Sequence, residues 1–135
     1  MNDATTRLRC AVAFANLSYE VTVQRMMVES GVVPIIAELS NSYSEDNQLY
    51  CAKALCNLGC HFGSEVKIVE QGGVSALMMI CMVRAVNHSS KQVCAKALLN
   101  LLIPEVSIRV ARARRARPCT ASRLLTRAFV RRADP

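Results

Sequence analysis

The residues of this chain whose types suit metal or covalent chemistry are seven cysteines and two histidines. Cys56, Cys60 and His61 lie close together in the sequence, and thiolate and imidazole are ligands that zinc prefers. A structural zinc site needs four ligands, and no second pair with matching spacing follows these three, so we predict no bound metal. Ser64 and Glu65 near His61 have the types of a catalytic dyad. A helix N-terminus explains them better, since serine caps a helix and glutamate suits its dipole.

The sequence also lacks the short motifs of common enzyme classes. No G-x-S-x-G, P-loop or H-E-x-x-H pattern is present, and these patterns provide a nucleophile, a phosphate cradle and a zinc site respectively. We therefore predict a protein that is not an enzyme and needs no cofactor. The odd number of cysteines and the absence of a secretory signal in residues 1–9 indicate free thiols and a cytoplasmic location. No apolar run reaches the ~18 residues of a membrane helix, so we expect no transmembrane segment.

A repeated eight-residue phrase organises the chain. It reads CAVAFANL at 10–17, CAKALCNL at 51–58 and CAKALLNL at 94–101, and a period of about 40 residues is typical of helical repeat proteins. Positions i, i+3, i+4 and i+7 share one face of a helix, so each phrase predicts a buried stripe. The three stripes are Cys10, Ala13, Phe14 and Leu17; Cys51, Ala54, Leu55 and Leu58; and Cys94, Ala97, Leu98 and Leu101.

Two further helices are expected before the second and third phrases. Each unit reads as a short helix, a glycine able to take a positive φ, an apolar helix and the phrase-bearing helix. The expected ranges are 21–29, Gly31 and 33–40 in the first unit, and 64–70, Gly72 and 74–86 in the second. S-x-x-E and S-x-x-Q spacing predicts a capping box at the start of each third helix. The paired residues are Ser42 with Glu45, and Ser89 with Gln92. Three methionines are assigned to the core: Met78, Met79 and Met82.

This order of elements, with a long helix ending in A-L-x-N-L, resembles the armadillo repeat. The resemblance covers residues 7–102 and implies an all-α fold, a right-handed superhelical solenoid with two full three-helix repeats and a leading helix. We divide it into a partial repeat at 7–19 and full repeats at 21–59 and 63–102. Because repeat arrays usually need about three units, we expect the chain to be a fragment or truncated form of a longer armadillo protein.

A polar stripe runs along the third helices beside the buried one. Lysine and asparagine stand four residues apart, and therefore neighbour each other on one helix surface. These positions are Lys53 and Asn57, then Lys96 and Asn100, with Asn16 at the matching position of the first phrase. In armadillo proteins the third helix lines a concave groove, and its asparagine holds the backbone of an extended peptide. The resemblance therefore assigns this role to Asn16, Asn57 and Asn100.

Val12, Lys53 and Lys96 stand where importin-α proteins carry tryptophan. The two lysines disfavour a basic import signal and favour an acidic ligand. We therefore predict a protein–protein interaction scaffold that binds an extended, acidic segment of a partner along the helix-three face. Its peptide-binding residues would be Asn16, Lys53, Asn57, Lys96 and Asn100. A structural interpretation stays open, in which these polar residues are simply solvated or the asparagines bridge turns.

The net charge of +7 comes from the C-terminal part of the chain. Residues 1–102, the expected solenoid domain, carry eight basic and eight acidic residues, whereas 103–135 carry nine arginines and two acidic residues. Such a tail, which we expect to be disordered, suits electrostatic binding to nucleic acid or an anionic membrane as an alternative function. It would also extend the location to the nucleus. The candidate contacts are Arg112, Arg114, Arg115, Arg117, Arg123 and Arg127.

Two further observations bear on the function of this tail. Phe129 is its only aromatic residue, and single-stranded nucleic acid is held largely by stacking on aromatic side chains, so we do not expect sequence-specific recognition. The abrupt change in composition near residue 102 fits a frame or splice boundary as well as it fits a functional basic tail.

Overall fold

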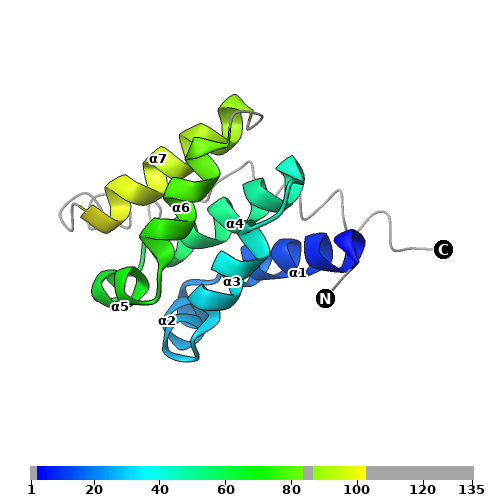
Figure 1. Ribbon diagram of the computed structural model, residues 1–135. Helices are drawn as coiled ribbons and strands as arrows, with labels where there is room; N and C mark the ends of the chain where they lie inside the picture. Colours follow the sequence, from blue (N-terminus) through cyan, green and yellow to red (C-terminus); the bar gives the residue numbers. More distant parts are fainter. Residues whose placement is uncertain (1–2, 84–86, 103–135) are drawn as a thin grey trace.

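A computed structural model describes residues 3–83 and 87–102, and the regular structure within them is α-helical (Figure 1). The all-α prediction is confirmed for this part of the chain. The tail at 103–135, with its six candidate arginines, lies outside the described residues. Among the helices that the structure describes, none has the length and apolar character needed to cross a membrane.

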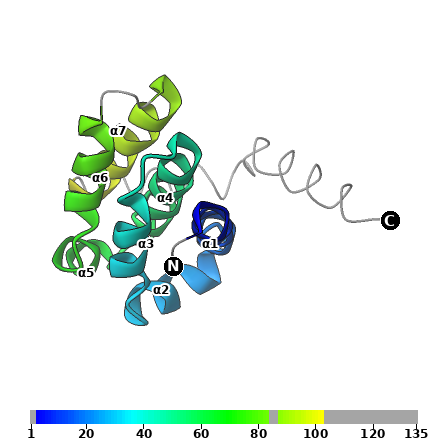
Figure 2. The ribbon, with the colours of Figure 1, turned by 45° about the vertical axis from the view of Figure 1, so that its right-hand side comes forward.

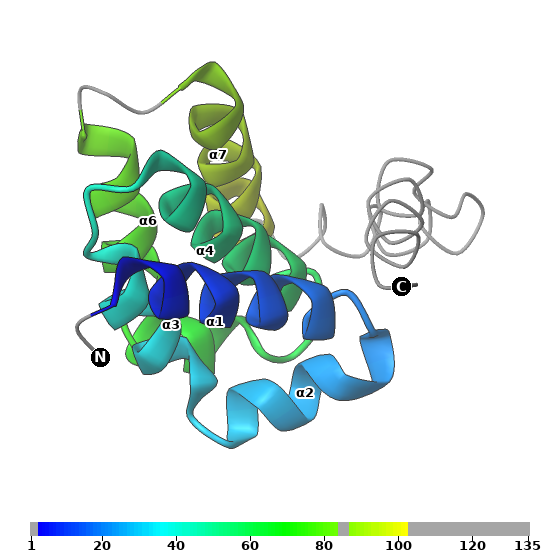
Figure 3. The ribbon, with the colours of Figure 1, turned by 90° about the vertical axis from the view of Figure 1, so that its right-hand side faces the viewer.

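Seven helices follow one another in the described residues. Their bounds are α1 Ala4–Leu17, α2 Val21–Glu29, α3 Val32–Ser40, α4 Glu45–Leu58, α5 Glu65–Glu70, α6 Gly73–Met82 and α7 His88–Leu102. The repeated phrases lie on α1, α4 and α7, which stand side by side with α4 in the middle (Figure 3). α3 packs against α4 and α6, and α6 also packs against α4 and α7. α2 and α5 lie at one end of the molecule (Figure 2).

Glycine turns separate α2 from α3 and α5 from α6. Gly31 has a φ of 75° and Gly72 a φ of 87°, a left-handed backbone that residues with a Cβ rarely adopt. Pro34 occupies the first turn of α3, where its missing N–H costs no intrahelical hydrogen bond. The predicted short helices and glycine turns are therefore confirmed, although α5 begins one residue later than expected.

Both predicted capping boxes are wrong in register. The side chain of Ser44, and not that of Ser42, accepts the hydrogen bond from the backbone N–H of Asn47 at the start of α4. At α7, Asn87 Oδ1 accepts a hydrogen bond from the backbone N–H of Ser90 at 3.0 Å. Each loop holds several short polar side chains that can accept such a bond, so the spacing of serine and glutamate or glutamine did not identify the one that does.

The second apolar helix is also shorter than predicted. α6 ends at Met82, and Val83 has an extended backbone with φ −67° and ψ 123°. Residues 84–86 lie outside the described residues. The three methionines predicted to fill the core are exposed on this helix. The buried side of α6 is formed by smaller and branched residues instead: Ala76, Leu77 and Ile80.

The buried stripes are confirmed on α4 and on α7, where Leu98 is half-buried, but only in part on α1. On α1, Ala13 and Leu17 are exposed, and the helix turns Ala11 and Ala15 toward the core instead. The cause is packing: in the described residues α1 packs mainly on α4 and α3, whereas α4 lies between two neighbouring phrase helices. The face of α1 that corresponds to the buried stripe of α4 is therefore partly exposed.

Candidate functional site

One face of α4 is left open by its neighbours and carries polar and aromatic side chains. Tyr50, Lys53 and Asn57 are half-buried there, at spacings of three and four residues, because the apolar stripe of α4 points to the opposite side. Lys53 Nζ lies 5.0 Å from the centroid of the Tyr50 ring. A lysine ammonium at this distance is attracted to the electron-rich face of the ring, so the pair holds a positive charge at a defined place.

The flanking helices extend this face. α1 contributes Arg9 and Asn16, and α7 contributes Lys96, all of them exposed. We call the surface of Arg9, Asn16, Tyr50, Lys53, Asn57 and Lys96 the α1–α4–α7 face. Its charged residues are three cations, and Asp46 near the start of α4 is the acidic residue on the same stripe. The face is therefore electropositive, although residues 1–102 carry no net charge.

The asparagines of the second and third phrases connect neighbouring phrase helices. Asn57 Nδ2 donates to the backbone oxygen of Ala15 at 3.4 Å and to Ser18 Oγ at 3.2 Å. Asn100 Nδ2 donates to the backbone oxygen of Cys56 at 3.5 Å and contacts Cys60 Sγ at 3.1 Å. Ala15 and Cys56 hold the same position in their phrases, so the same connection occurs twice and fixes α1, α4 and α7 parallel and in register.

The five predicted peptide-binding residues therefore differ in their surroundings. Lys53 and Lys96 lie on the open face, and Asn16 is exposed at its α1 side. Asn57 is half-buried, with the described hydrogen bonds of its side chain all coming from Nδ2. Asn100 is only 1% exposed. The asparagines do not form a uniformly exposed ladder, because Asn57 and Asn100 face the end of the preceding phrase helix.

Tyr50 and Arg9 belong to this face and escaped the sequence prediction. Tyr50 stands three residues before Lys53 and seven before Asn57, so helical spacing alone places it on the same stripe. The prediction relied on positions that recur in all three phrases. Tyr50 precedes its phrase, and the matching positions hold Arg9 and Val93.

Ser64 holds the N-cap position of α5 and Glu65 lies in its first turn, as predicted, but the Ser64 side chain makes no capping hydrogen bond. Ser64 Oγ instead lies 2.9 Å from His61 Nδ1, and Glu65 Oε2 accepts a hydrogen bond from the backbone N–H of Gly63. Ser64 is buried, and the described hydrogen bond of the His61 imidazole is the one with this serine. The pair therefore acts within the structure as a brace for the loop that joins α4 to α5.

The cysteines of the repeated phrases behave as apolar residues. Cys51 and Cys94 are fully buried, and burial raises the pKa of both thiols to about 12. A hydrogen bond with Cys81 adds to this rise for Cys94. Both thiols therefore stay protonated at neutral pH, whereas metal binding requires the thiolate. In the described residues, no group of three potential metal ligands comes together.

No protein family, curated protein or solved structure shows a match to this chain.

Proposed function

We propose that the protein is an armadillo-type solenoid scaffold that binds an extended acidic segment of a partner protein along the α1–α4–α7 face. The supporting observation is the Tyr50–Lys53 pair on the open side of α4, flanked by Arg9 on α1 and Lys96 on α7. Cations on three parallel helices suit a ligand with acidic side chains spaced along it, because neighbouring helices pack about 8–10 Å apart. That distance corresponds to roughly three residues of an extended chain.

The roles within the face follow from the contacts. Lys53 and Lys96 would attract acidic side chains, and the Tyr50 ring would cover an apolar part of the ligand. The amide oxygen of Asn57 would accept a hydrogen bond from a ligand backbone N–H, since Nδ2 is already engaged. Asn100 is assigned a positioning role, because it is buried against the end of α4.

The test uses fluorescence anisotropy with two labelled ten-residue peptides, one alternating glutamate and leucine, the other lysine and leucine. The full chain should bind the acidic peptide more tightly. The variant Lys53→Ala/Lys96→Ala should weaken that binding roughly tenfold, on the scale of one or two charge-assisted contacts. Lys91→Ala is the control for loss of a lysine elsewhere, because Lys91 is exposed on α7 outside the face. Equal losses in both variants would contradict the proposal.

The same assay distinguishes peptide binding by the α1–α4–α7 face from peptide binding by the tail. Replacing the six candidate arginines of the tail by glutamine tests electrostatic binding through residues 103–135, which remains a sequence prediction. If the tail variant loses acidic-peptide binding while the Lys53→Ala/Lys96→Ala variant keeps it, binding resides in the tail and the proposed scaffold function fails.

A further inference from the structure

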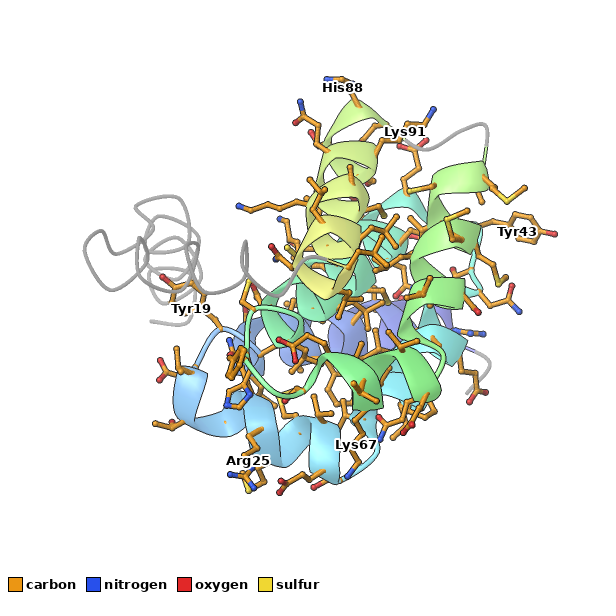
Figure 4. All side chains as sticks on the ribbon, turned by 90° about the vertical axis from the view of Figure 1, so that its left-hand side faces the viewer. Tyr19, Arg25, Tyr43, Lys67, His88 and Lys91 are labelled. Carbon is orange, nitrogen blue, oxygen red and sulfur yellow. The ribbon has the colours of Figure 1, made fainter. Side chains whose placement is uncertain are left out.

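A cavity of about 220 Å³ lies outside the α1–α4–α7 face, between α2, the loop after α4, and α5. Its lining residues are Arg25, Val28, Glu29, His61, Phe62, Gly63, Ser64 and Lys67. None of them belongs to the face proposed to bind peptide. Figure 4 shows Arg25 and Lys67 at one end of the molecule, with Lys91 at the other.

The lining of this cavity includes two cations, Arg25 and Lys67, and one carboxylate, Glu29. Arg25 Nε donates to Glu29 Oε1 at 2.7 Å. The pKa of the Glu29 carboxyl is held below its ordinary value first by this hydrogen bond and by the charge of Arg25, then by Lys67 and His61. Lys67 and His61 are thus close enough to act on the same carboxylate. Glu29 pairs with Arg25, so Lys67 is the lining cation without an ion pair among the described residues. The Glu65 carboxylate lies beside the same loop, where it accepts from the backbone N–H of Gly63.

The loop of the cavity is held by its own contacts. The hydrogen bond between His61 Nδ1 and Ser64 Oγ fixes the imidazole and leaves Nε2 as its second ring nitrogen. Gly63, with a φ of 90°, makes the tight bend between them. Phe62 is 63% exposed and also lines the cavity, so an apolar ring stands beside the cationic groups.

We infer that this cavity binds a small phosphate monoester, with the phosphoryl group on Arg25 and Lys67 and the organic part against Phe62. A phosphate dianion offers several acceptor oxygens, and arginine and lysine are the side chains that bind it best. His61 also lines the cavity. Glu29 competes with the phosphate for Arg25, so the site selects ligands that carry more than one negative charge.

The test is a residue-resolved nuclear magnetic resonance titration of the full ¹⁵N-labelled chain, with phenyl phosphate and with inorganic phosphate as probes at constant ionic strength. Saturable shifts are expected in amide signals of residues 25–29 and 61–67 for both probes. The residue resolution is needed because the arginines of the tail also attract phosphate. Phe62→Ala should weaken phenyl phosphate binding and leave inorganic phosphate unchanged.

Three charge variants sharpen the result. Lys67→Met should lower the affinity for both probes roughly tenfold, the loss of one charge-assisted contact. Glu29→Gln should raise the affinity, because it removes the competitor for Arg25. Lys91→Met makes the same charge change at the far end of the molecule and should change nothing. Shifts that do not saturate, or equal losses in Lys67→Met and Lys91→Met, would overturn the inference, whatever the outcome of the peptide assay.

Discussion

At the scale of the residue, two of the three asparagines of the repeated phrase have a structural role, which their hydrogen bonds and burial show. Asn57 and Asn100 each donate to the backbone of the preceding phrase helix, 42 and 44 residues earlier. Asn16 holds the same position in its phrase but is exposed. The same residue type at the same repeat position thus bonds to the preceding phrase helix in α4 and α7, whereas α1 has no phrase helix before it in the described residues.

This difference predicts unequal effects of alanine substitutions. Asn57→Ala should lower the free energy of unfolding by about 1–2 kcal/mol, because it removes hydrogen bonds to partly buried acceptors. Asn100→Ala should cost at least as much, since Asn100 is buried. Asn16→Ala should stay within about 0.5 kcal/mol of wild type, as is usual for exposed positions. Urea unfolding measures all three, and an equal loss in Asn16→Ala would refute the structural role.

The buried thiols predict a dependence of stability on alkaline pH. Cys51 and Cys94 have pKa values raised to about 12 from an ordinary value of 9.0. Between pH 9 and 12 the unfolded chain loses these protons while the folded chain keeps them, so stability present below pH 9 is lost as the pH rises. The expected slope is about 1 kcal/mol per pH unit for each thiol.

Urea unfolding at pH 7.5 and pH 10.5 measures this loss. Cys51→Ala removes one of the two buried thiols, so the variant should lose less stability than wild type between these pH values. Comparing the two proteins cancels the titration of tyrosines, lysines and the remaining cysteines. Identical losses would show that the Cys51 thiol ionises as easily in the folded chain as in the unfolded one.

At the scale of the element, two adjacent glycines begin α6 for different reasons. Gly72 has a φ of 87°, yet a Cβ there would meet no atom within 4 Å. A Cβ at Gly73 would lie 2.6 Å from Ile68 Cγ2 and 2.9 Å from the Ile68 backbone oxygen. Gly72 therefore allows the backbone conformation, and Gly73 allows α6 to approach the end of α5.

Alanine at each glycine should destabilise the protein by a different mechanism. Gly72→Ala should cost about 1–2 kcal/mol through the left-handed backbone alone. Gly73→Ala should cost about 1–3 kcal/mol through overpacking against Ile68. Gly72→Asn is the informative companion, because asparagine tolerates the left-handed region better than alanine. Urea unfolding in which Gly73→Ala matches wild type would contradict the close approach of α5 and α6.

The sequence predicted the positions of the helices well, but their caps and the exposure of individual side chains less well. The period and the positive-φ glycines located α2, α3, α5 and the three phrase helices, because those signals depend on local backbone chemistry. The caps at Ser44 and Asn87 were missed, since neighbouring polar residues compete for the same role. The exposure of Leu17 depends on which helices pack beside α1, and a single phrase does not carry that information. Tyr50 was missed although its spacing from Lys53 places it on the same stripe, because it precedes its phrase.

At the scale of the whole molecule, the charges of residues 1–102 balance in number but are unevenly placed on the surface. Residues 1–102 have equal numbers of basic and acidic residues, yet Arg9, Lys53 and Lys96 share one open surface on three parallel helices. Arg25 and Lys67 line the separate cavity between α2 and α5, together with Glu29. Asn57 and Asn100 stabilise the parallel arrangement of α1, α4 and α7. This arrangement brings the three cations of the face together.

A charge-exchange experiment on the α1–α4–α7 face tests the central claim most directly. The variant Lys53→Glu/Lys96→Glu is compared with Lys91→Glu for binding to the acidic and the basic ten-residue peptides, in the full chain. We predict that the double variant loses preference for the acidic peptide and gains affinity for the basic one, while Lys91→Glu keeps the wild-type preference. An unchanged preference in the double variant, or the same change in Lys91→Glu, would contradict the assignment of peptide binding to this face.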